Sequence, residues 1–300
     1  MPQILAAVGH DEKGAIAALT KAAAIARAHE LSLELFFCDA ECAYALEHQY
    51  EPGTAQEARE RCLASARSFL ARVANAVDLR NIPTSFDVAC ETPEYEAVVR
   101  KAIRMKPLMV VRNMGARPLS GEGYPDETDW ELVRSCPAPL LLTRTRPWKS
   151  SLRAIAAVDL SVGRVSSLER DIVAQAQFLA GRREGAVDII YGDANGSWTW
   201  EFSAKQAVLH ELAANAGIPR SHVSVLEGDP ARILSNHARN KDCDVVVLGA
   251  LTRQHALSSL VGSLTGRLPE KISSDFLVIK PPGFACGITE RTNQRPALRP

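Results

Sequence analysis

The sequence predicts an α/β protein built from two tandem five-stranded parallel-sheet domains with helices on both faces. Short apolar segments alternate with longer helical patterns along the chain, which is typical of βαβ units and a parallel sheet. The segments of the first half recur in order in the second, so that residues 4–8 (ILAAV) correspond to residues 154–158 (AIAAV). The 300 residues are 46% hydrophobic, which is enough for two domains that each bury a core.

The first half contains five candidate strands. Its opening segment is continuously apolar, as expected of a parallel strand that is covered on both faces. The helical pattern at 16–28 separates this strand from the next. The strands are expected at residues 3–8, 32–38, 84–89, 108–112 and 139–143.

The second half repeats this order. A helical pattern at 204–216 matches the alternation of the first half, and the segment 146–150 (RPWKS) is the expected linker. We therefore predict domains at 1–146 and 151–282. Residues 283–300 are polar and proline-containing, and we expect a disordered tail there. The strands are expected at residues 152–158, 186–191, 222–226, 244–249 and 276–280.

The segment 245–280 carries the most specific functional signal. Four apolar residues, 245–248, form a strand that ends at Gly249, where backbone can approach a ligand. Gly262 and Ser263 then open a helical segment. Free N–H groups, a hydroxyl and the positive end of the helix dipole suit an anion such as phosphate. The alternative is that Gly249 only makes a turn.

This segment resembles the nucleotide-binding signature G-x2-G-x9-G-[ST] of the universal stress protein family. Gly249, Gly262 and Ser263 keep the spacing, but Thr252 stands at the second glycine. The two-half layout is similar to the tandem, E-type branch of the family, and residues 129–137 and 277–281 carry that likeness. The resemblance implies strand order 3-2-1-4-5 in each half, and we expect the halves to pack about a pseudo-twofold axis through their fifth strands.

The resemblance also implies a site. An acidic residue after the first strand of a family domain meets the adenine–ribose side of ATP, and Asp159 holds that position in the second half. A helix-capping role is the alternative for Asp159. We expect ATP, with or without Mg²⁺, only in the second half. The expected nucleotide-binding residues are Asp159, Gly249, Thr252, Gly262 and Ser263.

The first half does not keep these signature residues. Its signature positions are Asn113, Ala116, Asp126 and Glu127, so that two carboxylates replace Gly-Ser at a helix start. Such residues cap a helix and repel phosphate. Gly9 stands where the second half has Asp159, with Asp11 two residues later. We expect no ATP binding of the family's kind in this half.

Composition and motifs bound the function class. Lys+Arg and Asp+Glu are both 35, so no basic field favours nucleic acid. No membrane span or signal peptide is recognised, and a cytoplasmic location is expected. Seven cysteines at irregular spacings favour reduced thiols over a disulfide framework. A metal site at Cys38, Cys42 and His48 is the weaker alternative.

The sequence contains no P-loop and no catalytic triad at a family-specific spacing. We therefore expect a non-catalytic stress-response regulatory protein with an adenine-nucleotide site. The alternative is a scaffold that does not bind ATP and instead holds an apolar small molecule or a protein partner between the halves. A slow ATPase is the least favoured interpretation. Both a monomer with pseudo-dimeric halves and a homodimer fit the sequence.

Overall fold

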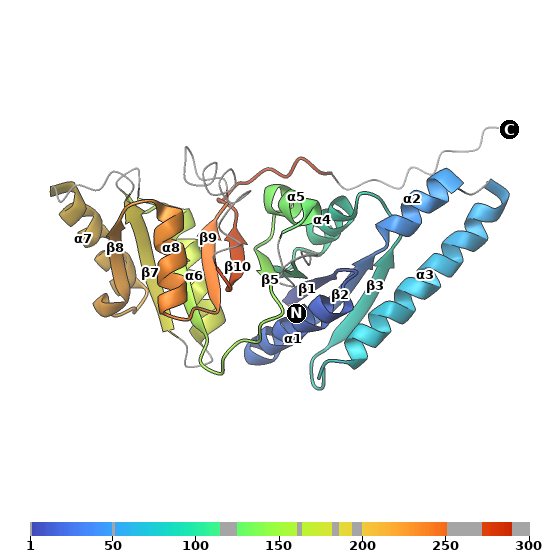
Figure 1. Cartoon of the computed structure of the whole chain (residues 1–300), viewed down its shortest axis with the longest axis horizontal. Helices are drawn as coiled ribbons and strands as arrows, with labels where there is room; N and C mark the ends of the chain where they lie inside the picture. Colours follow the sequence, from blue (N-terminus) through green and yellow to red (C-terminus); the bar gives the residue numbers. More distant parts are fainter. Residues whose placement is uncertain are drawn as a thin grey trace.

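The computed structural model describes residues 2–49, 52–114, 125–160, 164–181, 186–193, 200–250 and 272–289. Ten strands form one sheet in the order β3-β2-β1-β4-β5-β10-β9-β6-β7-β8 (Figure 1). Read outward from the centre, each half has the order 5-4-1-2-3, and all pairs within a half are parallel. The predicted fold class and strand order are confirmed, and the two five-stranded units form a single continuous sheet.

The first half begins with a strand and a helix that are both well defined by their residues. Asp11 accepts a hydrogen bond from the Gly14 N–H and so starts α1, and Glu30 ends this helix in a left-handed conformation. The described elements are β1 (Gln3–Val8), α1 (Glu12–His29), β2 (Ser32–Cys38), α2 (Ala40–Gln49), α3 (Pro52–Asn75), β3 (Thr84–Ala89), α4 (Glu94–Met105), β4 (Met109–Asn113), α5 (Glu127–Ser135) and β5 (Leu140–Thr143).

The second half repeats the order of strands. Asp229 caps α8 in front of a proline at the first helical position, where no N–H is needed. The described elements are β6 (Arg153–Ala157), α6 (Ser167–Ala180), β7 (Ala186–Asp193), α7 (Trp200–Asn215), the short 3-10 helix η2 (Arg220–His222), β8 (Val223–Glu227), α8 (Pro230–Asn240), β9 (Val245–Gly249) and β10 (Asp275–Ile279).

The halves meet through an antiparallel pair of strands. Leu277 of β10 faces Leu141 of β5, and the pairs on either side, Phe276 with Leu142 and Val278 with Leu140, are arranged symmetrically about them. Equivalent strands that pair antiparallel are related by a local twofold axis. The prediction that the fifth strands join the halves is confirmed.

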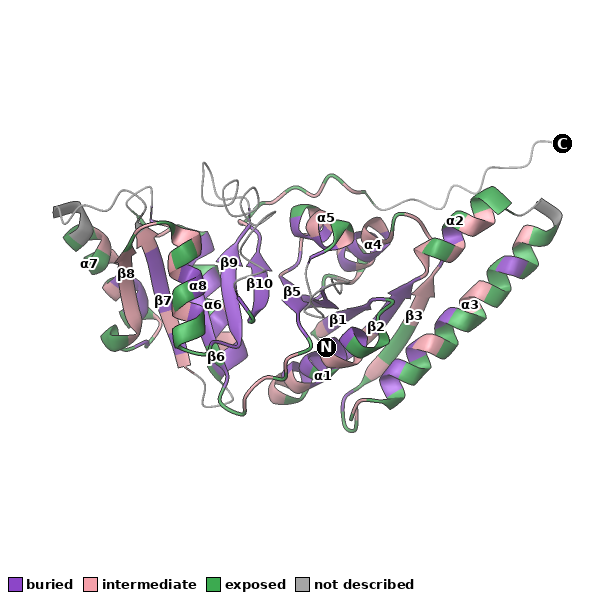
Figure 2. Ribbon diagram, in the orientation of Figure 1, coloured by how far each residue is buried: buried purple, intermediate pink, exposed green. Residues whose placement is uncertain are grey.

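Two apolar cores lie on opposite faces of the sheet, and each contains residues of both halves. One is covered by helices α1, α3, α6 and α7, and the other by α4, α5 and α8. Figure 2 shows that the central strands are buried, whereas β3 and β8 at the two sheet edges are only partly covered. The shared cores make the junction an interior of the molecule.

A buried ion pair crosses the junction. The Lys21 ammonium of α1 lies 2.7 Å from the Asp275 carboxylate of β10, and their side chains are 4% and 2% exposed. The Trp148 indole N–H and the Arg144 backbone N–H also donate to Asp275. Burial lowers the pKa of Lys21 and raises the pKa of Asp275, while each group favours the charged form of the other. The pair is thus held together by the hydrogen bonds that satisfy it.

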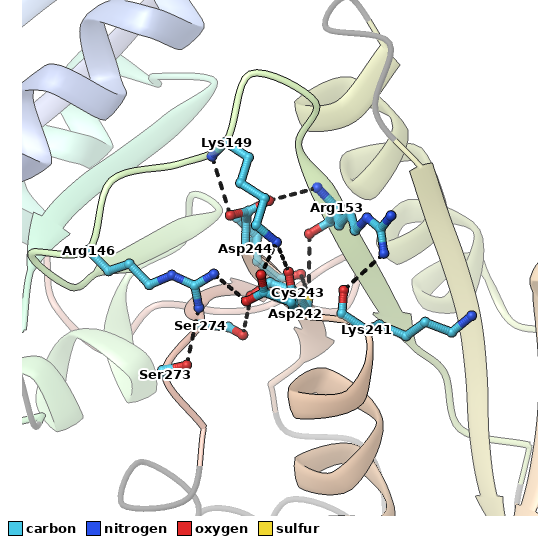
Figure 3. A network of polar contacts seen from close by, with 10 residues as sticks. Arg146, Lys149, Arg153, Lys241, Asp242, Cys243, Asp244, Ser273 and Ser274 are labelled. Atoms are coloured by element: carbon cyan, nitrogen blue, oxygen red, sulfur yellow. Dashed lines mark hydrogen bonds and ion pairs between the residues drawn. The ribbon is translucent and has the colours of Figure 1, made fainter.

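The predicted linker is bound to the second half (Figure 3). Arg146 and Lys149 both contact the Asp242 carboxylate, at 2.5 and 2.6 Å. The Asp244 carboxylate accepts a hydrogen bond from the Arg153 backbone N–H at 2.9 Å, at the start of β6. Because these bonds join the linker to the segment before β9, they fix the entry of the chain into the second half.

Two expectations from the sequence need correction. The disordered tail was expected from residue 283, but residues 283–289 are ordered against the first half, where the Cys286 thiol donates to the Ser135 carbonyl. Residues 290–300 lie outside the described part. Reduced thiols were expected, but Cys42 of α2 and Cys62 of α3 form a disulfide, with a Cα–Cα distance of 6.4 Å. Both contacts join positions that local sequence patterns do not relate.

Lys21→Met should lower the free energy of unfolding by about 3–5 kcal/mol, because it leaves a buried carboxylate without its counter-charge. Lys21→Met with Asp275→Asn should cost clearly less than the sum of the two single changes, since both charges are then absent. Urea unfolding checks this, with Arg80→Ala in an exposed ion pair as a control that should leave the midpoint unchanged. Additive losses would contradict the coupling.

Candidate functional site

The expected site lies where β6 and β9 end side by side. The two strands pair in parallel up to Ala157 and Leu248, so Asp159 and Gly249 follow at neighbouring strand ends. The order of strands changes direction at β6, because β9 lies on one side of it and β7 lies on the other. Ligands of open α/β sheets bind at the carboxyl ends of strands at such a switch point. Asp159 is half-buried at this edge.

Gly249 is required by the packing of a helix. A Cβ atom at this position would lie 2.8 Å from Cδ2 of Leu168 and 3.4 Å from Cδ1 of Ile172, both in α6. The absent side chain therefore lets the first turns of α6 approach the end of β9. This gives the glycine a structural reason that the sequence did not reveal, and it shows that Gly249 is more than a turn residue.

The start of α6 is closed by a capping box. The Ser166 hydroxyl accepts from the Leu168 N–H at 3.1 Å, and the Glu169 carboxylate accepts from the Ser166 N–H at 2.8 Å. Glu169 is buried. Two N–H groups at this helix start are therefore already satisfied by the chain itself.

The remaining predicted site residues cannot be placed. Thr252, Gly262 and Ser263 lie outside the described residues, so their roles stay predictions. Of the five expected nucleotide-binding residues, the described part of the structure brings together Asp159 and Gly249.

The matching edge of the first half is filled by Asn113. Its side chain lies where a Cβ on Gly9 or Gly14 would fall, with calculated separations of 3.0 Å to Oδ1 and 2.6 Å to Nδ2. Asn113 is 5% exposed, and its Oδ1 is buried without a hydrogen-bond partner among the described residues. The space at the switch point between β1 and β4 is thus occupied by the protein.

At this contact between a strand end and a helix, the two halves place the larger side chain on different elements. In the second half the strand end is bare and the helix contributes Leu168, against Gly249. In the first half the strand end contributes Asn113 and the helix is bare at Gly14. The same volume is filled from opposite sides, which explains why each half tolerates a glycine in a different element.

Buried charges complete the first-half edge. The Arg112 guanidinium lies 2.6 Å from Glu94 and 2.8 Å from Asp129, and the Asp129 side chain is 0% exposed. Burial raises the pKa of Asp129 to about 6, although Arg112 opposes this shift. Burial also works against the charge of Arg112, but Glu94 and Asp129 outweigh it and raise its pKa. The cluster is internally neutralised and closely paired.

The acidic helix start of the first half is a cap. The Asp126 carboxylate accepts from the Asp129 N–H at 2.8 Å, and the Asp129 carboxylate accepts from the Asp126 N–H at 3.1 Å. The predicted capping role of this segment is confirmed for Asp126, while Glu127 is the first residue of α5. The sequence analysis missed Arg112 and Glu94. A charged residue in an apolar strand was the only signal at Arg112, and Glu94 resembles an ordinary acidic residue at a helix start.

Cys38 and His48, from the alternative metal site, each contact a backbone carbonyl. The Cys38 thiol donates to the Glu91 carbonyl, and His48 contacts the Tyr44 carbonyl within α2. Among the described residues, no group of three or more His, Cys, Asp or Glu side chains is arranged to hold a metal ion. None of the helices in the described ranges combines the length and the apolar character that a membrane crossing requires.

The sheet order and the helices on both faces define a tandem α/β protein with one parallel five-stranded unit in each half. Residues 165–280 match the model of the Universal stress protein family. The second half therefore carries a domain of this family, and the chain is similar to its E-type members. It is 25% identical over 171 residues to "Universal stress protein E homolog" of Haemophilus influenzae, covering 51% of this chain and 55% of the relative.

Further similarities extend over more of the chain. Universal stress protein E of Escherichia coli K12 is 22% identical over 225 residues, covering 67% of this chain and 69% of the relative. A crystal structure of a universal stress protein from Archaeoglobus fulgidus covers 93% of this chain and 98% of its own, with a TM-score of 0.69 and 14% identity. The last likeness establishes the two-domain fold, and the others place the chain beside the E-type proteins.

Gly249→Ala should destabilise the protein by about 1–3 kcal/mol, because the new methyl overlaps Leu168. In a Leu168→Ala background, where the contested space is vacant, Gly249→Ala should cost clearly less than it does in the natural chain. Gly181→Ala, in the last turn region of the same helix with no atom within 4 Å, is the matched control. Thermal unfolding measures the natural chain and the four variants, and an equal cost of Gly249→Ala in both backgrounds would contradict the packing role.

Proposed function

We propose that the chain is a non-catalytic stress-response regulatory protein whose second half holds an adenine-nucleotide site. The supporting observation is the asymmetry between the two switch points. In the second half, the acidic residue Asp159 follows β6 beside the end of β9, whereas Gly9 holds the corresponding position after β1 in the first half. A single nucleotide per chain is the expected stoichiometry.

The carboxylate of Asp159 is the group that we assign to the ribose hydroxyls. A carboxylate at a strand end accepts two such hydrogen bonds, as it does in dinucleotide-binding folds. Gly262 and Ser263 are assigned to the phosphates, through backbone N–H groups and a hydroxyl. If Mg²⁺ accompanies ATP, the hydroxyls of Thr252 and Ser263 are the groups that we assign to it.

The non-catalytic assignment rests on what hydrolysis of ATP requires. A hydrolase positions a water molecule beside the γ-phosphate and neutralises the charge that develops on it. The sequence contains no P-loop, and the strongest cluster of buried charges, Arg112 with Glu94 and Asp129, is already paired in the opposite half. Binding without turnover is therefore the function that these residues support.

Thr252 limits the affinity. A β-branched residue at a position where the family has glycine is strongly disfavoured if the backbone there has a positive φ. We therefore propose that the natural chain binds ATP weakly, and that it responds to nucleotide only when the concentration is high.

Thr252→Gly should raise the affinity for Mg-ATP by about 1–3 kcal/mol, the strain that a glycine relieves. In that background, Asp159→Asn should weaken binding and Asp11→Asn should not, because Asp11 is the matched acidic residue after the first strand of the other half. Isothermal titration calorimetry gives both the affinity and the stoichiometry.

Two results would overturn the nucleotide proposal. Two equivalent sites per chain would mean that the first half binds as well, and tight binding by the natural chain without a gain in Thr252→Gly would remove the role of Thr252. If no variant binds ATP, the scaffold interpretation stands instead.

A further inference from the structure

The disulfide between Cys42 and Cys62 joins two helices that have few buried contacts of their own. Figure 1 shows α2 and α3 at the outer end of the first half, beside the edge strand β3. Among the described residues of α2 and positions 54–65 of α3, those that are buried are Ala43 and Ala58. Both alanines lie outside the two apolar cores. Segments with few buried apolar contacts open locally at a low cost in free energy.

The last turns of α3 are held in a different way. Their apolar side chains belong to one of the two cores, and they do not need a covalent link. These residues are Ala66, Leu70, Val73 and Ala74. The disulfide therefore lies in the part of the two helices that the apolar core does not hold.

The α3 segment around the disulfide covers a third cysteine. Cys90 follows β3 and is 3% exposed. It lines a hollow of about 260 Å³, and Arg59 and Leu63 of α3 form part of the same wall. Leu63 is the residue after Cys62, so the disulfide fixes this wall directly. The charges of Glu47 in α2 and Arg59 in α3 both act on the Cys90 thiol, which places both helices close to it.

This cover protects the Cys90 thiol in two ways. It keeps reagents in solution away from the sulfur atom. Burial also raises the pKa of Cys90, while the charge of Arg59 acts against this shift. Because the thiolate is the nucleophilic form of cysteine, a raised pKa lowers the reactivity further. Removal of the α3 wall returns water to the sulfur atom and removes the burial that raises the pKa.

The disulfide itself is within reach of solvent. Cys42 and Cys62 are both half-buried. The other five cysteines are free thiols, and all of them except Cys286 are buried. A disulfide exchanges when a thiolate attacks one of its sulfur atoms, and access is one of the factors that set the rate. A half-buried bond that closes a poorly buried segment is therefore suited to reversible reduction.

We propose that Cys42 and Cys62 form a redox switch that uncovers Cys90 when a dithiol reductant opens the disulfide. A thiolate of the reductant attacks one sulfur atom, so that a mixed disulfide forms and the other sulfur leaves as a thiolate that takes up a proton. The second thiol of the reductant then breaks the mixed disulfide. The chain gains two electrons and two protons, and the reductant becomes a disulfide.

The expected effect follows from the loop that the bond closes. The two cysteines are separated by 20 positions in the sequence, and a cross-link over such a loop disfavours open states by about 100-fold. Reduction should therefore raise the population of chains in which α2 and the start of α3 have opened by about this factor. The oxidised chain hides the Cys90 thiol and the reduced chain presents it. The switch lies in the first half, so its test is independent of nucleotide binding at Asp159.

The natural chain provides the first test. Oxidised protein, and protein reduced with dithiothreitol that is then removed under argon, are pulsed with N-ethylmaleimide, and peptide mapping by mass spectrometry gives the rate at each cysteine. Cys90 should react about 100-fold faster in the reduced chain. Cys243, which is buried in the other half, should stay slow in both states. Hydrogen exchange should rise across α2 and residues 54–65 and remain low across 66–75.

Variants separate the bond from the reagent that reduces it. Cys42→Ser combined with Cys62→Ser should label Cys90 at the fast rate without dithiothreitol, and dithiothreitol should not change that rate. Cys286→Ser, at a half-buried thiol outside the disulfide, is the matched control and should keep the response of the natural chain. Thioredoxin, a dithiol protein, should reduce the bond in the folded chain without denaturant. Circular dichroism verifies that each variant is folded.

Several results would overturn the proposal. Equal rates at Cys90 in the oxidised and reduced chains, or slow labelling in the folded double variant, would mean that the disulfide does not control the cover. A parallel rise at Cys243 would indicate global unfolding instead of local opening. Failure of thioredoxin to reduce the folded chain would mean that the bond is not accessible. Free thiols at Cys42 and Cys62 after treatment with oxidised glutathione would mean that the bond does not form reversibly.

Discussion

The antiparallel pairing of β5 with β10 is the contact on which the rest of the structure depends. It joins two parallel sheets at the strands that would otherwise be exposed edges, and an exposed edge invites pairing with other chains. Because the pair runs about a local twofold axis, each apolar core continues from one half into the other. The outer edges, β3 and β8, then remain as the partly covered ends of a single sheet. The sequence repeat thus provides two equivalent strands, β5 and β10, and their pairing covers the inner edge of each half.

Charges placed at this junction specify how the halves meet. Relative to apolar residues, a buried pair such as Lys21 and Asp275 contributes little net stability, because both groups lose their hydration. Its geometry is nevertheless demanding, since Asp275 also receives N–H groups from Trp148 and Arg144. A shift in the register of β10 would leave these charges unpaired in a dry interior. On the other face of the sheet, the hydrogen bonds from Lys280 to the end of α5 also favour this one arrangement of the halves.

The halves differ at the point where the strand order of each sheet changes direction. Asn113 and Gly14 in one half, and Gly249 and Leu168 in the other, fill equivalent space from opposite sides. In the first half, Arg112 also forms ion pairs with Glu94 and Asp129, which neutralise its charge. The paired charges suit the first half to a structural role, and the second half is the one in which we propose a binding site. Such a division is open to a tandem chain because one copy can lose a site while its partner keeps the fold.

The sequence by itself determined the fold class and the two-half organisation, and the family resemblance implied the order of strands. The fold class and the two halves follow from the alternation of apolar segments with helical patterns, which is read along the chain, as is the cap at Asp126. It also identified Asp159 and Gly249 as neighbours, because parallel strands present their carboxyl ends at one edge.

Only the tertiary structure decided which residues meet across long sequence distances. The bare position of Gly249 serves Leu168, the disulfide joins Cys42 to Cys62, and Cys286 returns to the end of α5. None of these contacts has a local pattern, because each arises from packing between elements whose separation in the chain is set by the fold. The sequence determined where the chain forms strands and helices, and the packing of those elements decided which thiol, which carboxylate and which glycine acquired a partner.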